Sequence, residues 1–303
     1  MAADALLSAG HRVMLCEAKP SIGRKYLMAG KSGVNLTKAE AFGSFLDAYG
    51  AAAPMLRPIL EHFPPEAVAA WANGLGQPTF TGSTGVGRIL LAQAADQVMK
   101  CSMELGGNAP FIVFDDADLD AAVQGAIMCK FRNNGQTCVC ANRIYVQAGV
   151  YDAFAAKLKE AVSKMKVGDG LEDGTDLGPL ITTKAIEKVQ QHIADAKSKG
   201  AEVILGGGDT LQGAGNFIEP TIVTGATKDM LFSTDETFGP LAPLFKFEDE
   251  NEVIELANDT IFGLASYFYA KDLSRVYKVA EALEYGIVGV NTGIISTEVA
   301  PFG

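Results

Sequence analysis

Short apolar runs alternate with longer segments of helical periodicity through most of the chain after residue 110. The run Phe111-Ile112-Val113-Phe114 lies between Pro110 and Asp115 and has the length of a buried strand. Further strands are predicted by similar runs at 144–146, 203–205, 221–223, 244–247, 266–269 and 287–290.

Amphipathic helices are predicted between several of these strands. In one of them Phe154, Leu158, Val162 and Met165 recur at the spacing that places apolar side chains on one helix face. The helical segments are predicted at 118–130, 150–165, 184–199, 252–258 and 273–283. Strands and helices that alternate in this way favour the α/β class, with a mostly parallel sheet covered by helices.

The composition narrows the classes of partner. The 303-residue chain is long enough for one large domain or two. Its 36 acidic and 25 basic residues give a net charge of −11 without a dense cationic patch, which excludes nucleic acid as a partner. The sequence has no apolar run of the length that spans a membrane, so we predict no membrane partner. The N-terminus carries Asp4 and lacks the basic segment of a secretory signal.

The cysteines indicate free thiols rather than a disulfide framework or a metal centre. Their number is odd and they form no zinc-type CxxC pairs, so we predict a reducing, cytoplasmic location and no metal site. The five are Cys16, Cys101, Cys129, Cys138 and Cys140.

One cysteine lies in a setting that favours nucleophilic chemistry. Cys138 follows Asn134-Gly135-Gln136-Thr137, and Glu104 precedes Leu105-Gly106-Gly107 upstream. A free thiol is mostly protonated at neutral pH, so a nucleophilic cysteine needs a base nearby. Backbone can approach a ligand closely at glycines, which makes Glu104 a candidate for that base.

The segments 103–110 and 131–143 resemble the active-site signatures of the aldehyde dehydrogenase superfamily. The longer run through Cys140 and Asn142 is similar to its succinate-semialdehyde dehydrogenase branch. The resemblance implies oxidation of a small aldehyde, in that branch succinate semialdehyde, to a carboxylic acid. Cys138 would carry a thiohemiacetal and then a thioester, and Glu104 would be the general base.

The same resemblance implies a bound NADP or NAD. The string from Gly82 and Ser83 resembles the turn that binds the cofactor phosphates at the N-terminus of a helix, which we expect to extend to about Met99. Glu236 and Phe238 lie in a segment similar to the one that binds the nicotinamide ribose and backs the ring.

Specificity and regulation are implied at three further positions. Arg132 and Ser296 match places that hold the distal carboxylate of the substrate in the succinate-semialdehyde branch. A guanidinium suits this role because it binds a carboxylate through two parallel hydrogen bonds. Cys140, two residues after Cys138, matches a cysteine that can close a redox-switch disulfide with the nucleophile.

The resemblance divides the chain into three predicted parts. Residues 110–303 would form the aldehyde dehydrogenase catalytic domain, and 80–109 a remnant of the NAD(P)-binding domain. Residues 1–79 instead resemble a partial Rossmann-like segment of FAD-dependent, NAD(P)H-oxidising flavoproteins, with a helix at 2–9, a strand at 12–17 and a cationic glycine-rich loop at 23–37. The change near residue 80 predicts a fusion junction, and a sequence-assembly error gives the same pattern.

Several segments of the family have no counterpart in this sequence. The first half of the cofactor domain, with its oxyanion asparagine and the discriminator between NAD and NADP, has no counterpart. The family is homo-oligomeric, and the chain ends before the last strand used in oligomer contacts. We therefore predict the lineage and leave the activity of the isolated chain open. The alternatives are a flavoprotein oxidoreductase fragment, a non-catalytic chimeric remnant and a cofactor-independent thioesterase.

Overall fold

The computed structural model describes residues 42–47, 49–50, 53–62, 64, 67, 79–211 and 215–296. Its contacts divide the chain into two units, Met1–Leu105 with Ser296–Phe302, and Gly106–Ile295 with Gly303. The elements predicted at 2–9, 12–17 and 23–37 lie outside the described residues.

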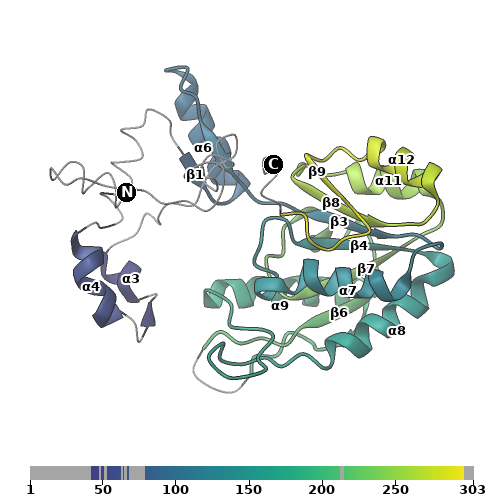
Figure 1. The fold of residues 1–303 in the computed structure, drawn as a ribbon, viewed down its shortest axis with the longest axis horizontal. Helices are drawn as coiled ribbons and strands as arrows, with labels where there is room; N and C mark the ends of the chain where they lie inside the picture. Colours follow the sequence, from purple (N-terminus) through teal and green to yellow (C-terminus); the bar gives the residue numbers. More distant parts are fainter. Residues whose placement is uncertain are drawn as a thin grey trace, which may run out of the picture. The chain divides into compact units, whose positions relative to one another are not determined.

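The first unit contains short elements on either side of one longer helix. They are α3 (Phe42–Asp47), α4 (Ala53–His62), β1 (Thr79–Thr81), α6 (Thr84–Ala95) and β2 (Ser102–Glu104). β1 and β2 pair in parallel, and α6 connects them (Figure 1). The sequence predicted that this helix extends to about Met99. It ends earlier because the chain turns after Ala95 and Val98 adopts a left-handed φ of 53°.

The second unit is built on a parallel sheet. Its strands are β3 (Ala109–Val113), β4 (Ala141–Gln147), β5 (Glu202–Leu205), β6 (Thr221–Ala226), β7 (Leu241–Phe247), β8 (Ala265–Tyr269) and β9 (Ile287–Val290). Among the described residues they form a seven-stranded sheet in the order β5-β6-β7-β4-β3-β8-β9. The pairs are parallel, apart from the antiparallel β5 and β6 at one edge. The predicted strands are present, and the prediction of a mostly parallel sheet is confirmed.

Helices cover both faces of this sheet (Figure 1). They are α7 (Leu119–Lys130), α8 (Tyr151–Val162), α9 (Thr183–Ser198), α10 (Leu231–Thr234), α11 (Glu250–Asn258) and α12 (Leu273–Ala282), with the short 3-10 helices η2 (Arg132–Gly135) and η3 (Ala148–Val150). α9, α11 and α12 bury Val189, Val253 and Val279 in one cluster against the sheet. α7 lies on the other face, where a Cβ at Gly125 would be 1.9 Å from the Tyr269 hydroxyl.

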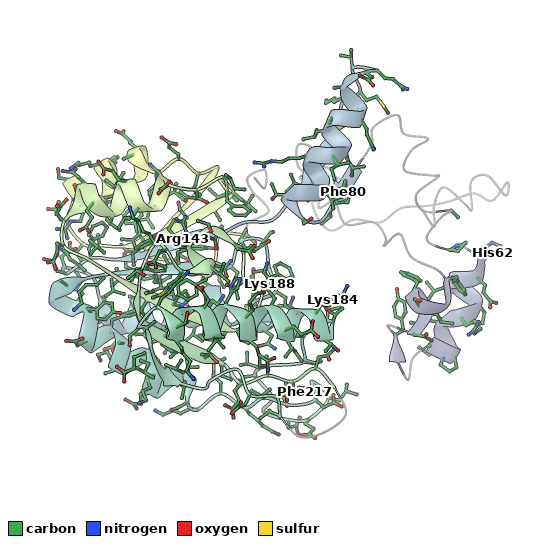
Figure 2. All side chains as sticks on the ribbon, turned by 180° about the vertical axis from the view of Figure 1, so that it is seen from behind. His62, Phe80, Arg143, Lys184, Lys188 and Phe217 are labelled. Atoms are coloured by element: carbon green, nitrogen blue, oxygen red, sulfur yellow. The ribbon has the colours of Figure 1, made fainter. Side chains whose placement is uncertain are left out.

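The core also contains charged side chains. Arg143 lies inside the sheet-based unit (Figure 2), and it and Lys130 are almost completely buried. A buried charge is tolerated only where its hydrogen-bond donors find acceptors, so these two residues mark places where the structure is specified by polar contacts.

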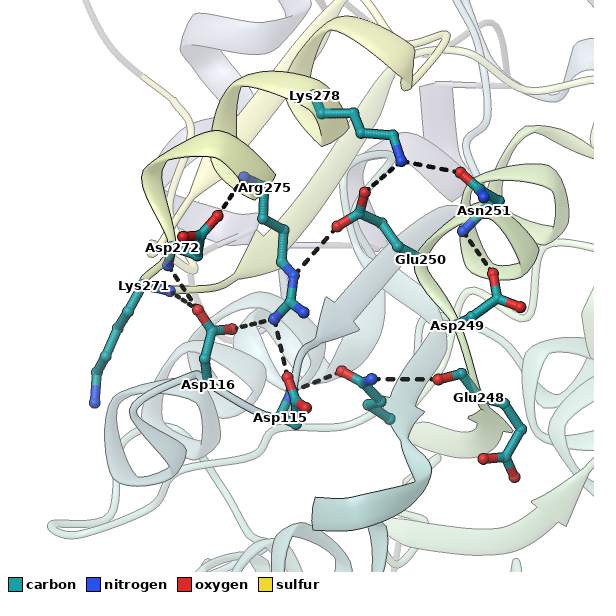
Figure 3. Close-up of polar contacts among 11 residues, drawn as sticks. Asp115, Asp116, Glu248, Asp249, Glu250, Asn251, Lys271, Asp272, Arg275 and Lys278 are labelled. Carbon is teal, nitrogen blue, oxygen red and sulfur yellow. Dashed lines mark hydrogen bonds and ion pairs between the residues drawn. The ribbon is translucent and has the colours of Figure 1, made fainter.

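An ion-pair network joins the C-terminal end of β3 to α11 and α12 (Figure 3). Arg275 contacts Asp115 at 2.9 Å, Asp116 at 2.6 Å and Glu250 at 3.2 Å. Asp116 also accepts hydrogen bonds from the backbone amides of Lys271 and Asp272. Burial raises the pKa of the Asp116 carboxyl, but these amides and Arg275 outweigh it and leave that pKa lowered.

None of the described helices is long and apolar enough to cross a membrane.

Candidate active site

Cys138 lies in a tight loop between α7 and β4. Asn133, Asn134 and Gly135 have φ values of 51°, 57° and 75°, three consecutive residues in the left-handed region. Asparagine and glycine tolerate this conformation better than other residues, which explains the Asn-Asn-Gly run in the motif. The reversal returns the chain toward the sheet, where Cys138 is half-buried and Cys140 is buried.

Polar side chains of the motif fix this loop to the segment before α9. The Asn134 side-chain amide donates to the Gly178 carbonyl at 2.8 Å. The Gln136 side-chain oxygen accepts from the Ile181 backbone amide at 3.0 Å. Asn134 and Gln136 therefore have structural roles. The sequence motif alone does not distinguish such structural residues from catalytic ones.

The backbone after Cys138 rests on buried groups of α7 and β8. The Val139 carbonyl accepts from the Tyr267 hydroxyl at 2.8 Å and from the Cys129 thiol at 3.7 Å. The Cys140 thiol donates to the Lys130 carbonyl at 3.2 Å. Burial raises the pKa of the Cys129 thiol to about 12 and also raises that of Cys140. Neither thiol is suited to act as a nucleophile in this conformation, which leaves Cys138 as the candidate in this loop.

A glycine turn connects this loop to Glu236. The Gly107 backbone amide donates to the Glu236 carboxylate at 3.0 Å. A Cβ at Gly107 would be 2.1 Å from the Cys138 carbonyl oxygen, and one at Gly106 would be 2.4 Å from a Glu236 carboxylate oxygen. The turn therefore has no room for side chains and holds the segment of Cys138 and the carboxylate of Glu236 on either side of it.

Two consecutive buried hydrogen bonds also hold the glycine turn in place. The Lys130 ammonium donates to the Asn142 side-chain oxygen at 2.8 Å, and the Asn142 amide donates to the Gly107 carbonyl at 3.5 Å. Burial raises the pKa of the Glu236 carboxyl, and the Gly107 amide and the nearby lysine charges oppose that effect only in part. Lys130 was not singled out from the sequence, because a single lysine carries no motif signal. Asn142 was named only as part of the branch motif, with no role of its own.

Replacing Gly107 with alanine should lower the free energy of unfolding by about 1–3 kcal/mol, because the new methyl overpacks a filled site. Its contact is the Cys138 carbonyl, a backbone atom that moves only with the loop. Gly106→Ala meets the end of the flexible Glu236 side chain and should be milder. Gly149→Ala, with no atom within 4 Å of the new Cβ, is the matched control. Urea denaturation midpoints check this order, and equal midpoints for the Gly107 and Gly149 variants would contradict it.

The other residues proposed from the sequence are divided between the two units. Glu104, Ser83, Gly82 and Ser296 belong to the first unit. Glu104 is the last residue of β2, and Ser296 is exposed. The pairing of Glu104 with Cys138 crosses the two units and stays a prediction.

Arg132 and Phe238 are exposed in the second unit, together with the half-buried Glu236. Arg132 is the first residue of η2, and Phe238 is 37% exposed with a φ of 52°. Phe238 thus presents an aromatic ring at the surface from a left-handed backbone position, an unusual conformation for a bulky residue. Such strained positions are concentrated at ligand sites.

The N-terminus of α6 has the features of a phosphate site. Ser83 is its N-cap and accepts from the Val86 amide at 3.4 Å, and the buried Thr84 hydroxyl has no hydrogen-bond partner among the described residues. The amides of a first helical turn together with a spare hydroxyl suit a phosphate group. The Gly82 amide differs from the sequence expectation, because it already donates to the Glu104 carbonyl at 3.0 Å. Within the first unit, the first turn of α6 therefore has donors of the kind that bind the phosphate of a dinucleotide.

Comparison with known proteins agrees with this geometry. The sequence profile of the "Aldehyde dehydrogenase family" matches residues 72–303. The chain is 67% identical to the glutarate-semialdehyde dehydrogenase of Pseudomonas aeruginosa over 225 residues, 74% of this chain and 46% of that protein. It is 65% identical, with the same coverage, to the NADP(+) succinate-semialdehyde dehydrogenase of Escherichia coli K12.

Solved structures give the same result. A crystal structure described as an E. coli NADP-dependent enzyme superposes with a TM-score of 0.74 at 64% identity, over 75% of this chain and 47% of that one. The chain thus spans about half the length of the relatives it matches. These matches lend no support to the flavoprotein resemblance of residues 1–79, and the family match extends into that segment from residue 72. On this combination of profile, identity and fold, the chain belongs to the aldehyde dehydrogenase family.

Proposed function

We propose that the chain carries the nucleophilic cysteine of an NAD(P)-dependent dehydrogenase. The proposed reaction oxidises an aldehyde with a distal anionic group to the carboxylic acid. Succinate semialdehyde is the proposed substrate. The observation that carries the proposal is the glycine turn at Gly106 and Gly107, which touches both the Glu236 carboxylate and the backbone of Cys138.

Cys138 is the proposed nucleophile. Glu104 accepts the thiol proton and passes it to solvent, and the thiolate adds to the carbonyl carbon of the aldehyde, giving the alkoxide form of a thiohemiacetal. The bound nicotinamide cofactor supplies the acceptor for the hydride that this carbon loses. The resulting thioester is hydrolysed by water, with Glu104 again as the base, which releases the carboxylic acid and restores the thiol.

The proposed cofactor contacts are the candidates named from the sequence. Ser83 and the first turn of α6 would bind a phosphate, Glu236 would accept a hydrogen bond from a ribose hydroxyl, and Phe238 would pack on the nicotinamide. Burial raises the pKa of the Glu236 carboxyl, and the hydrogen bond from the Gly107 amide offsets that effect only in part. A sugar hydroxyl would supply a further donor.

The substrate class is supported by the names of three similar relatives. Their names specify glutarate semialdehyde, succinate semialdehyde and 3-sulfolactaldehyde, each an aldehyde with an anion at the other end. Arg132, exposed on η2 shortly before Cys138, is the proposed partner of that anion, with Ser296 as a second donor.

Cys140 is the proposed redox partner of Cys138. Closing that disulfide requires the Cys140 thiol to leave its hydrogen bond with the Lys130 carbonyl. Because Cys140 is buried and its thiol pKa is raised, a two-electron oxidant of the peroxide class would first convert Cys138 to a sulfenic acid, which the Cys140 thiol would then attack with loss of water.

The proposal is tested by titrating NADP and NAD into the purified chain by calorimetry and by following reduced-cofactor formation with succinate semialdehyde, glutarate semialdehyde and butanal. We expect binding of at least one cofactor and a higher kcat/KM for the two anionic aldehydes than for butanal. Binding without turnover would limit the chain to cofactor binding. Neither binding nor turnover would favour the non-catalytic alternative.

A further inference from the structure

A buried histidine supports the loop that carries Glu236 and Phe238. His192 lies on α9 and is 1% exposed, and its ring contacts two residues that flank Glu236. Nδ1 is 3.1 Å from the Thr237 hydroxyl, and Nε2 is 3.3 Å from the Asp235 carboxylate. The proposed catalytic steps use none of these three side chains.

The chemistry of the partners fixes the direction of both hydrogen bonds. An ionised carboxylate only accepts, so the Nε2–H of His192 donates to Asp235. In a neutral imidazole the other nitrogen is then an acceptor, so the Thr237 hydroxyl donates to Nδ1. Protonation of Nδ1 would replace this acceptor with a donor. Thr237 is 1% exposed, so its hydroxyl would then have to turn and accept from the ring instead.

We propose that neutral His192 is a positioning residue that fixes the segment 235–238 through Thr237 and Asp235, and so sets the placement of Glu236 and Phe238 for the nicotinamide half of the cofactor. The proposal rests on the cofactor roles proposed above for Glu236 and Phe238. Phe238 has a left-handed φ of 52°, a conformation that a loop without such support is not expected to keep.

The charges around His192 favour the neutral ring. Burial lowers its pKa, the Asp235 carboxylate opposes that effect, Lys188 adds to the lowering and Asp195 opposes it, with a net lowering. Lys188, which is labelled in Figure 2, lies on α9. Asp195 lies on the same helix, and Asp235 comes from the loop. A pKa below that of the unfolded chain means that the unfolded state takes up a proton first as pH falls. The stability due to neutral His192 is therefore present above about pH 6.5 and is lost on acidification.

Two substitutions at Thr237 separate the hydrogen bond from packing. Thr237→Val keeps the shape and removes the donor, whereas Thr237→Ser keeps the donor. Neither variant alters Glu236 or Phe238. The first readout is hydrogen exchange of the 236 and 238 amides by NMR, together with the ring nitrogen shifts of His192, which report its tautomer.

We expect an Nε2-protonated ring in the wild type and about tenfold faster exchange at both amides in Thr237→Val. Thr237→Ser should exchange like the wild type, and the wild type should come to resemble Thr237→Val as His192 is protonated. Equal exchange in the valine and serine variants, or a ring protonated at Nδ1, would overturn the proposal.

Calorimetric titration of NADP then separates this proposal from the proposed function. A several-fold weaker affinity for Thr237→Val than for Thr237→Ser supports the positioning role, and equal affinities overturn it. If the wild type binds neither NADP nor NAD, the cofactor role of the loop fails with the proposed function. The exchange data then still decide whether His192 orders the segment.

Discussion

Replacing Cys138 with serine should slow the formation of reduced cofactor from succinate semialdehyde by about 10⁴-fold or more. Loss of a nucleophile that acts together with its base has costs of this order in other enzymes. A serine hydroxyl is far less acidic than a thiol, so the same base produces almost no alkoxide. The thioester that water hydrolyses also cannot form. The measurement is kcat/KM for the variant and the wild type under the same conditions.

A second readout does not depend on turnover. Cys138 and Cys101 are the half-buried thiols of the described residues, whereas Cys129 and Cys140 are buried. Cys101→Ser is the matched control, because Cys101 is half-buried like Cys138 and has no proposed catalytic role. A serine hydroxyl can also donate to the Met99 carbonyl as the Cys101 thiol does, so this variant should keep full activity. Iodoacetamide should alkylate Cys138 faster than a free cysteine, and NADP should change that rate. Equal rates at Cys138 and Cys101, with or without NADP, would favour the non-catalytic alternative.

The sheet could be predicted because each strand is a short apolar run between turn residues, as at 111–114 and 287–290. The edge strand β5 (Glu202–Leu205) matches the strand predicted at 203–205, but its antiparallel direction was not predicted. Direction depends on how the connection between β5 and β6 folds back, and an apolar run does not encode it. The short strands β1 and β2 were also missed, since three residues carry no usable periodicity.

The site was predicted only as far as its residues form a contiguous motif. Cys138 and Glu236 are candidates from the sequence because their neighbours in sequence are distinctive. His192 was missed because it is one buried position on an amphipathic helix, and its partners lie in a loop about forty residues away. Lys130 likewise acts through contacts that only the folded chain brings together. Motifs thus name candidate chemical residues, while the residues that hold these candidates in place emerge from tertiary structure.

Arg143, the last residue of the motif at 131–143, also has a role that only its tertiary contacts reveal. It is 1% exposed on β4, and its Nε donates to the Asn108 carbonyl at 3.0 Å. Its two terminal nitrogens donate to the Leu256 carbonyl at 3.0 Å and the Ala257 carbonyl at 2.9 Å, both in the last turn of α11. A helix C-terminus presents unpaired carbonyls with partial negative charge, so a buried guanidinium is stabilised there without a carboxylate.

Arg143→Met should therefore lower the free energy of unfolding by about 3–5 kcal/mol, because several buried acceptors lose charged donors worth about 1.5–3 kcal/mol each. Tyr285→Phe removes one hydroxyl that contacts the same guanidinium and should cost about 1 kcal/mol, which makes it the graded control. Asn108 directly follows the glycine turn, so the Arg143 variant should also reduce the alkylation rate of Cys138 before global unfolding begins. Urea denaturation and thiol labelling of one sample check both parts. A methionine variant as stable as Tyr285→Phe would mean that packing, and not the capping of α11, holds this region together.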